Sequence, residues 1–288
     1  MGEAWFMGET RRMFPDLAGD LQGMALHDLQ KPLVELASGV SSFGPLAEWT
    51  DWFHYLLPRV LHRCHETYVS ALLEILITGF MTQHPDSLGP EPYAGFRRDA
   101  LETLGRCLMD PRCWPDGRIH LYHCLNKYYV EPVGSWFFSD PSAKLSASLF
   151  LCLKYLPSDK VAPWMTSVLS IRSAHWRAQL MVWLVAAHDT LTGATRQPAE
   201  FQDDGVQLGW DWSHVLDGSY TGDYSGTAKV SEFIAPENSR QAIEAVRAIM
   251  TEDVFLAWLQ SISRYDYLEA ELADVPYWFN DLYGAGTA

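Results

Sequence analysis

Apolar residues recur at three- and four-residue steps through most of this chain, and that spacing constrains the fold more than any other feature. The longest such pattern begins near Leu46 and runs to about Met81, with Pro58 inside it. Side chains at this spacing lie on one face of an α-helix. Because proline removes a backbone hydrogen bond from a helix, the pattern predicts either one helix kinked at Pro58 or two helices that meet there.

Shorter patterns of the same kind predict further helices, several of which start at a capping residue. They cover Tyr93 to Leu108, Ile119 to Val130, a helix opened by Asp140 and Pro141, Ser158 to Leu169, Ser173 to Ala187, Asn238 to Met250, and Thr251 to Ile262. Short helices joined by tight breaks predict an all-α fold of stacked antiparallel helical hairpins. The alternation resembles a HEAT-like architecture, and an irregular helical bundle is the other arrangement that fits.

One long segment, residues 194–237, lacks helical periodicity and is rich in Gly, Asp, Ser and Tyr. Loops of this length are uncommon in compact proteins and are usually functional or disordered. The sequence therefore predicts four regions: an irregular helical N-terminal cap (1–45), a helical-hairpin body (46–193), an acidic aromatic loop insertion (194–237) and C-terminal helices that pack on the body (238–288). The aromatic tail, residues 274–284, is expected to pack back in the same way.

Negative charge is concentrated at the C-terminal end of the chain. The net charge is -15, and the stretch from Ala199 to Ala288 holds sixteen acidic and four basic residues, a net of -12. Such a surface repels nucleic acid and attracts a cationic protein. The distribution predicts a basic protein partner and no nucleic acid, although acidity that only keeps the protein soluble is the alternative.

The N-terminus and the cysteines indicate the compartment. The stretch MGEAWFMGETRRMF has no basic region followed by an apolar core, and the longest uninterrupted apolar run, Leu180 to Ala187, is too short for a bilayer span. Five scattered cysteines without an export signal are expected to be reduced core thiols. These features predict a cytoplasmic protein that does not bind a membrane.

The common enzyme signatures are missing from the sequence. His65 and Glu66 begin a zincin-type H-E-x-x-H motif, but Val69 stands where the second histidine is required. No nucleotide-binding glycine motif and no nucleophile elbow occur. Cysteines and histidines between Cys107 and Cys124 are of the types that bind zinc, but their spacing is not that of a zinc finger. We therefore expect a non-enzymatic protein without a cofactor.

One dipeptide supports an alternative function. His188-Asp189, in LVAAHDTLTG, resembles the metal-binding turn of the all-helical HD phosphohydrolases. The resemblance implies a metal-dependent hydrolase in which His188 and Asp189 hold a metal ion that activates water. The structural alternative is that His188 lies near the end of a helix, where a histidine interacts favourably with the helix dipole.

The 194–237 segment supplies the favoured site. Its carboxylates alternate with large aromatic residues, and the candidate partner-binding set is Asp203, Asp204, Trp210, Asp211, Trp212, Asp217, Tyr220, Asp223 and Tyr224. Trp and Tyr anchor interfaces, and carboxylates pair with Lys or Arg of a basic partner. The other interpretation is a structural loop whose aromatic rings fill the core. The favoured function is a protein that masks a basic partner, as an immunity protein or antitoxin neutralises a cationic toxin.

Overall fold

The computed structural model shows an all-α fold, together with one small β-hairpin, and confirms the predicted fold class. The residues that it describes are 19–25, 28, 46–64, 70–85, 91–105, 127–130, 135–138, 141–172, 174–195, 210, 212–217, 233–264 and 273–284. Within them, no helix has the length and apolar content needed to cross a membrane.

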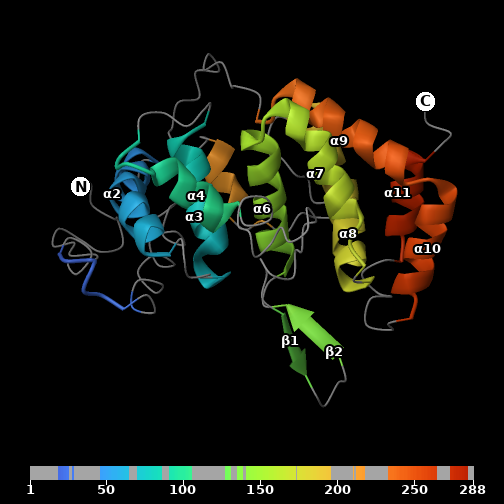
Figure 1. Cartoon of the computed structure of the whole chain (residues 1–288), viewed down its shortest axis with the longest axis horizontal. Coiled ribbons are helices and arrows are strands. Elements are labelled where there is room, and N and C mark those ends of the chain that lie inside the picture. Colours follow the sequence, from blue (N-terminus) through green and yellow to red (C-terminus); the bar gives the residue numbers. More distant parts are fainter. Residues whose placement is uncertain are drawn as a thin grey trace. The chain divides into compact units, whose positions relative to one another are not determined.

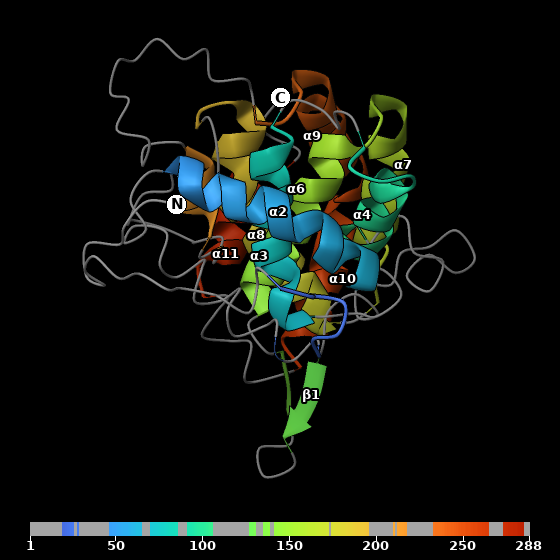
Figure 2. The same cartoon turned by 90° about the vertical axis from the view of Figure 1, so that its left-hand side faces the viewer.

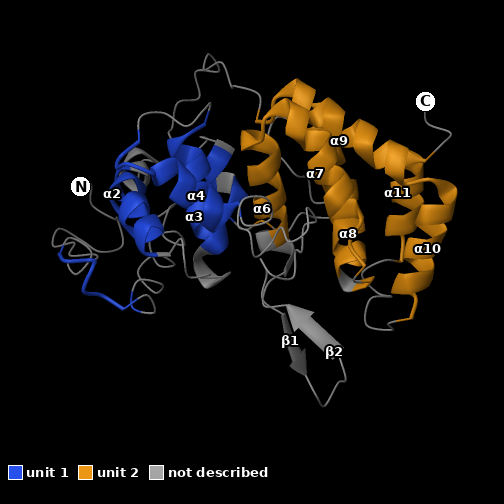
Figure 3. Ribbon diagram, in the orientation of Figure 1, with its two compact units in different colours: residues 1–105, 211–231 blue, residues 106–210, 232–288 orange. Residues whose placement is uncertain are grey.

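The chain divides into two compact units (Figure 3). Unit 1 comprises residues 1–105 and 211–231, and unit 2 comprises residues 106–210 and 232–288. The predicted body, residues 46–193, therefore contributes to both units. The predicted loop insertion is divided between them as well.

The described part of unit 1 contains three α-helices, α2 (Leu46–Cys64), α3 (Ser70–Gln83) and α4 (Phe96–Leu104). Helix α2 packs against both α3 and α4 (Figure 2), and the 3-10 helix η5 (Ser213–Asp217) packs against α3. Pro58 lies inside α2, and α3 is a separate helix, so the long predicted pattern contains two helices.

Close packing of α2 on α3 depends on a glycine. A Cβ atom at Gly79 of α3 would lie 2.3 Å from Cδ1 of Phe53, whose side chain is fully buried. The absence of that atom lets the Phe53 ring lie directly against the α3 backbone. Helix α4 starts later than the sequence predicts because Gly95, just before it, adopts a φ of 90°, in the left-handed region.

Unit 2 contains six described helices (Figure 1). In chain order these are α6 (Pro141–Tyr155), α7 (Ser158–Leu169), α8 (Ala174–Thr192), α9 (Pro236–Ile249), α10 (Glu252–Ile262) and α11 (Val275–Tyr283). Helix α7 packs against α9, and α8 contacts α6, α9, α10 and α11. Helix α8 is therefore central to the unit, and its Trp176, Met181 and Leu184 are fully buried.

Helix α9 begins two residues before the predicted cap. Pro236 occupies its first position, where the missing N–H leaves no hydrogen bond unmade. Asn238 consequently lies inside the first turn and is buried. Its Nδ2 donates to the carbonyl oxygens of Leu153 and Leu156, at 2.7 and 2.9 Å, and its Oδ1 accepts from Ser158 Oγ at 2.7 Å. The amide thus joins α9 to the end of α6 and the start of α7.

The helix predicted from Ile119 to Val130 is wrong at its described end. Residues Lys127–Val130 form strand β1, which pairs antiparallel with β2 (Ser135–Phe138). Tyr and Val residues fit a pleated strand at least as well as a helix, so the local composition favours the hairpin once a partner strand follows.

Candidate functional site

Helix α11 has one buried face and one exposed aromatic face. Val275, Phe279 and Tyr283 recur at four-residue steps and are buried in unit 2. Tyr277 and Trp278 point away from that buried line and are 73% and 41% exposed. The exposed rings therefore result from the same periodicity that packs the helix.

Helix α10 repeats the arrangement with an aliphatic residue. Trp258 and Ile262 are buried, whereas Leu256 is 53% exposed. Glu252 and Asp253, one turn earlier on the same side of the helix, are also exposed. Thr251 caps the helix by accepting a hydrogen bond from Val254 N at 3.4 Å, so the position of the first turn is fixed.

Ring contacts hold α10 and α11 together at one end of unit 2 (Figure 1). Phe255 and Phe279 are stacked, with ring centroids 5.6 Å apart and an interplanar angle of 7°. The Tyr283 hydroxyl donates to Leu184 O of α8 at 2.9 Å, and burial raises the pKa of this phenol. The Arg177 guanidinium of α8 lies over the ring of Trp258 on α10. These contacts fix the orientation of both helices.

Carboxylates surround the exposed apolar side chains. Asp274 and Asp281 lie one turn before and one turn after Tyr277 and Trp278, and both are exposed. We refer to these exposed residues of the two helices together as the acidic aromatic face: Glu252, Asp253 and Leu256 on α10, Asp274 at the N-cap of α11, and Tyr277, Trp278 and Asp281 on α11.

The carboxylates of the acidic aromatic face differ from those on α9. Among the described residues, none of the four on the face forms an ion pair. On α9, by contrast, Arg240 binds Glu237 and Glu244 at 2.5 and 2.7 Å, and these hydrogen bonds lower the pKa of Glu237. The face therefore presents negative charge that neighbouring described side chains do not neutralise.

The structure places three of the nine residues predicted in the 194–237 segment. Trp210 belongs to unit 2, where it is buried and stacks on Phe150 with ring centroids 6.0 Å apart. Trp212 belongs to unit 1, is partly exposed, and donates its backbone N–H to Glu74 Oε1 at 3.3 Å. Asp217 ends η5, and its side chain lies outside the described atoms. The remaining predicted residues lie outside the described part of the chain: Asp203, Asp204, Asp211, Tyr220, Asp223 and Tyr224.

The alternative metal site rests on His188 and Asp189 of α8. His188 Nδ1 lies 3.6 Å from Asp189 Oδ1, and the imidazole meets the Tyr283 ring edge-on. Asp189 is largely exposed and His188 is mostly buried. No group of three or more potential metal ligands occurs among the described residues. Helix α8 continues to Thr192, whose Oγ1 donates to His188 O, so the histidine lies just before the last turn.

Comparison of the chain with protein-family models, with curated proteins and with solved structures yields no match. The functional assignment therefore depends on the residues described above.

Sequence reasoning grouped the tail with the packed body and so missed Tyr277 and Trp278. The signal that identifies them is the spacing of Val275, Phe279 and Tyr283, which assigns one face of α11 to the core. Residues between these positions must then face outward. The same reasoning applied to Trp258 and Ile262 identifies Leu256 as exposed.

Proposed function

We propose that this protein binds and masks a basic protein partner through its acidic C-terminal third, in the manner of an immunity protein or antitoxin. The observation that carries the proposal is the acidic aromatic face. Leu256, Tyr277 and Trp278 are exposed, and carboxylates lie one helical turn from each of them. Large exposed apolar side chains bordered by polar residues are typical of protein-binding surfaces.

The two residue types of the face have different roles in binding. Trp278 and Tyr277 bury apolar area at low entropic cost because their rings have few rotatable bonds, so they act as anchors. Asp274, Asp281 and Glu252 attract Lys and Arg side chains of the partner and increase the rate of encounter. Because these carboxylates are exposed, salt screens them, and the affinity falls as ionic strength rises.

The proposal shifts the anchors from the 194–237 segment to α10 and α11. Trp210 contributes to the core of unit 2, so it is not an anchor in this conformation. Trp212 lies in the other unit and is not part of the acidic aromatic face. Carboxylates of the segment still add to the negative charge of the C-terminal third and to long-range steering.

Co-purification with identification of the bound protein tests the proposal. We expect the full-length protein to capture a partner with net positive charge at low salt and to release it at high salt. The double variants Y277S/W278A and D274K/D281K should each lose that partner. The matched control is Asp159→Lys, which reverses an exposed carboxylate on α7 of the same unit. Equal loss with the control, or capture of a partner with net negative charge, would contradict the proposal.

A metal-dependent hydrolase built on His188 and Asp189 is the second candidate. It is supported by the short distance between Nδ1 and Oδ1, and by His188 Nδ1 having no hydrogen-bond partner among the described residues. Metal analysis of the purified protein tests it. Stoichiometric transition metal that disappears with His188→Ala would favour the hydrolase, and metal-free protein would exclude it.

A further inference from the structure

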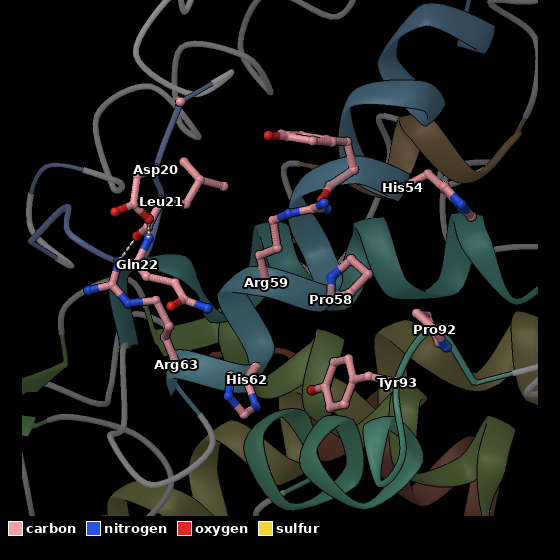
Figure 4. A pocket seen from close by; sticks show the side chains of 12 residues that line it. Asp20, Leu21, Gln22, His54, Pro58, Arg59, His62, Arg63, Pro92 and Tyr93 are labelled. Carbon is pink, nitrogen blue, oxygen red and sulfur yellow. Dashed lines mark hydrogen bonds between the residues drawn. The ribbon is translucent and has the colours of Figure 1, made fainter.

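Helix α2 of unit 1 has an apolar face and a basic face. Trp52, Phe53, Leu56, Leu57, Val60 and Leu61 are buried against the rest of the unit. The residues between these pairs are His54, Tyr55, Pro58, Arg59, His62 and Arg63, and all six line one pocket (Figure 4). The helical period therefore gathers two arginines and two histidines on one side of α2.

The pocket has walls from three separate segments. Besides α2, it is lined by residues 19–22 and by Pro92 and Tyr93, which precede α4. All of these residues belong to unit 1. The cavity has a volume of about 760 Å³, which is within the range of small-molecule binding sites.

The charge of the lining is opposite to that of the whole protein. Arg59 and Arg63 carry permanent positive charge. Among the described residues that line the cavity, Asp20 is the one carboxylate, and its Oδ1 accepts from Gln22 N at 3.0 Å.

Asp99 is an acidic group close to this basic face, but other residues hold it. Its carboxylate accepts hydrogen bonds from Arg98 Nη2 at 2.9 Å and from the Tyr93 hydroxyl at 3.1 Å. His62 Nδ1 lies 3.9 Å from it. Asp99 is buried, so it is a packed group of α4 and does not enter the pocket's lining.

Contacts within unit 1 fix the position of both arginines, and each guanidinium keeps N–H groups that these contacts do not use. The Arg59 guanidinium lies over the Tyr55 ring, 4.1 Å from the centroid, and Nη1 donates to Tyr55 O. Arg63 Nη1 donates to Leu21 O across the pocket. A guanidinium has five N–H donors, so each arginine retains donors beyond these contacts. The paired N–H groups of a guanidinium held in this way have the spacing needed to donate to two oxygen atoms of a phosphate or carboxylate group.

We propose that this pocket binds a small multivalent anion that carries phosphate or carboxylate groups. Arg59 and Arg63 bind its oxygens, and His62 adds a donor from the same helix, whereas the Nδ1 atom of His54 is hydrogen-bonded to Gln83 Oε1 at 2.9 Å. A concave site of limited volume selects a small molecule. An extended nucleic acid is disfavoured by the charge of -15 on the whole chain.

Calorimetric titration of the full-length protein with pyrophosphate and, separately, with citrate tests the inference. We expect at least one of the two to bind with a dissociation constant below about 1 mM. The double variant R59Q/R63Q should weaken that binding by about tenfold or more, because charge-assisted hydrogen bonds are lost. The tighter of the two ligands identifies the preferred group.

Arg97→Gln is the matched control. It removes one positive charge, half of what R59Q/R63Q removes, from the same unit, at an exposed position of α4 outside the pocket. Its affinity should stay within about twofold of the wild-type value. Binding of neither anion, or equal weakening by Arg97→Gln, would overturn the proposal. A thermal unfolding curve of R59Q/R63Q that matches the wild type, expected for exposed or partly exposed arginines, separates lost binding from lost folding.

Discussion

Helix α2 of unit 1 and helix α11 of unit 2 use one pattern to display opposite chemistry. Each buries an apolar line at helical spacing and exposes the residues between. On α2 these residues include Arg59, His62 and Arg63, whereas on α11 they include Tyr277, Trp278 and Asp281. The comparison teaches that the net charge of -15 agrees with the carboxylates near α11 but gives no indication of the basic surface of α2. The position of each charged residue around its helix decides whether its side chain is exposed to a ligand.

The two regions also differ in shape. The basic residues of α2 line a concave pocket, which suits a small ligand. The exposed residues of α10 and α11 project from helix surfaces, and Tyr277 is 73% exposed. Projecting aromatic side chains suit insertion into a partner protein. Shape and charge together are the basis for proposing a small anion as the ligand of unit 1 and a basic protein as the partner of unit 2.

The largest expected effect on stability is in unit 2, at the buried amide that joins three helices. Asn238→Ala should lower the free energy of unfolding by about 3 kcal/mol, because two carbonyl oxygens and the Ser158 hydroxyl lose their partner in the interior. Chemical denaturation measures the loss. Gln260→Ala, which also removes an amide side chain but at an exposed position of α10, should change stability by less than about 0.5 kcal/mol. Similar losses in both variants would show that the amide has no special role.

An intermediate effect is expected in unit 1, where the α2–α3 contact requires a glycine. Gly79→Ala should destabilise the protein by about 2 kcal/mol, because the added methyl group overlaps the Phe53 ring. In an ordinary helix interior the same change stabilises by about 0.5–1 kcal/mol. Denaturation therefore shows whether Gly79→Ala lowers the free energy of unfolding, as close contact with Phe53 predicts, or raises it, as in an ordinary helix interior.

Phe53→Leu in the Gly79→Ala background tests the cause. A smaller side chain at this position should recover part of the loss, which a double-mutant cycle would show as a favourable coupling. A stabilising Gly79→Ala variant would contradict the close packing of these helices.

The smallest effect is a pH dependence specific to unit 1. Burial, and secondly the charge of His54, lower the pKa of His84, which lies against Phe80 and Phe96. The unfolded chain then binds a proton more readily than the folded one. Above the ordinary histidine pKa near 6.5, His84 does not reduce the free energy of unfolding. As the pH decreases from there toward the lower pKa of the folded state, the free energy of unfolding falls.

His84→Gln should flatten this part of the stability profile. Denaturation between about pH 5 and 8 measures the profile, and NMR titration of the imidazole measures its pKa directly. A His84 pKa above the ordinary value would contradict the assigned cause.

Much of the fold follows from local sequence signals. Pro141 and Thr251 mark the starts of α6 and α10 because first-turn prolines and capping residues act within a few residues. Ser158 is the first residue of α7, but Pro157 occupies the N-cap position and no side chain caps that helix. Lys127–Val130 could not be assigned from local sequence alone, because a strand requires a partner strand elsewhere in the chain. Asn238 looks like a cap in sequence, yet its side chain bonds to residues about eighty positions away.

The candidate sites were harder to predict than the helices. The acidic C-terminal third was recognised by counting charges, but counting does not distinguish buried Trp210 from exposed Trp278. The basic pocket depends on Leu21, Arg63 and Tyr93, which are distant in sequence and meet only in the folded unit. A helical-wheel plot of α2 gives a local signal for the pocket. It places His54, Arg59 and Arg63 away from the buried apolar residues.

The most direct test of the account is a crossed binding experiment. R59Q/R63Q and Y277S/W278A are each titrated with the tighter of pyrophosphate and citrate and are each tested for capture of the basic partner. The account predicts that the first variant loses the anion and keeps the protein, and that the second loses the protein and keeps the anion. Loss of the same ligand in both variants would contradict the assignment of separate functions to the two units.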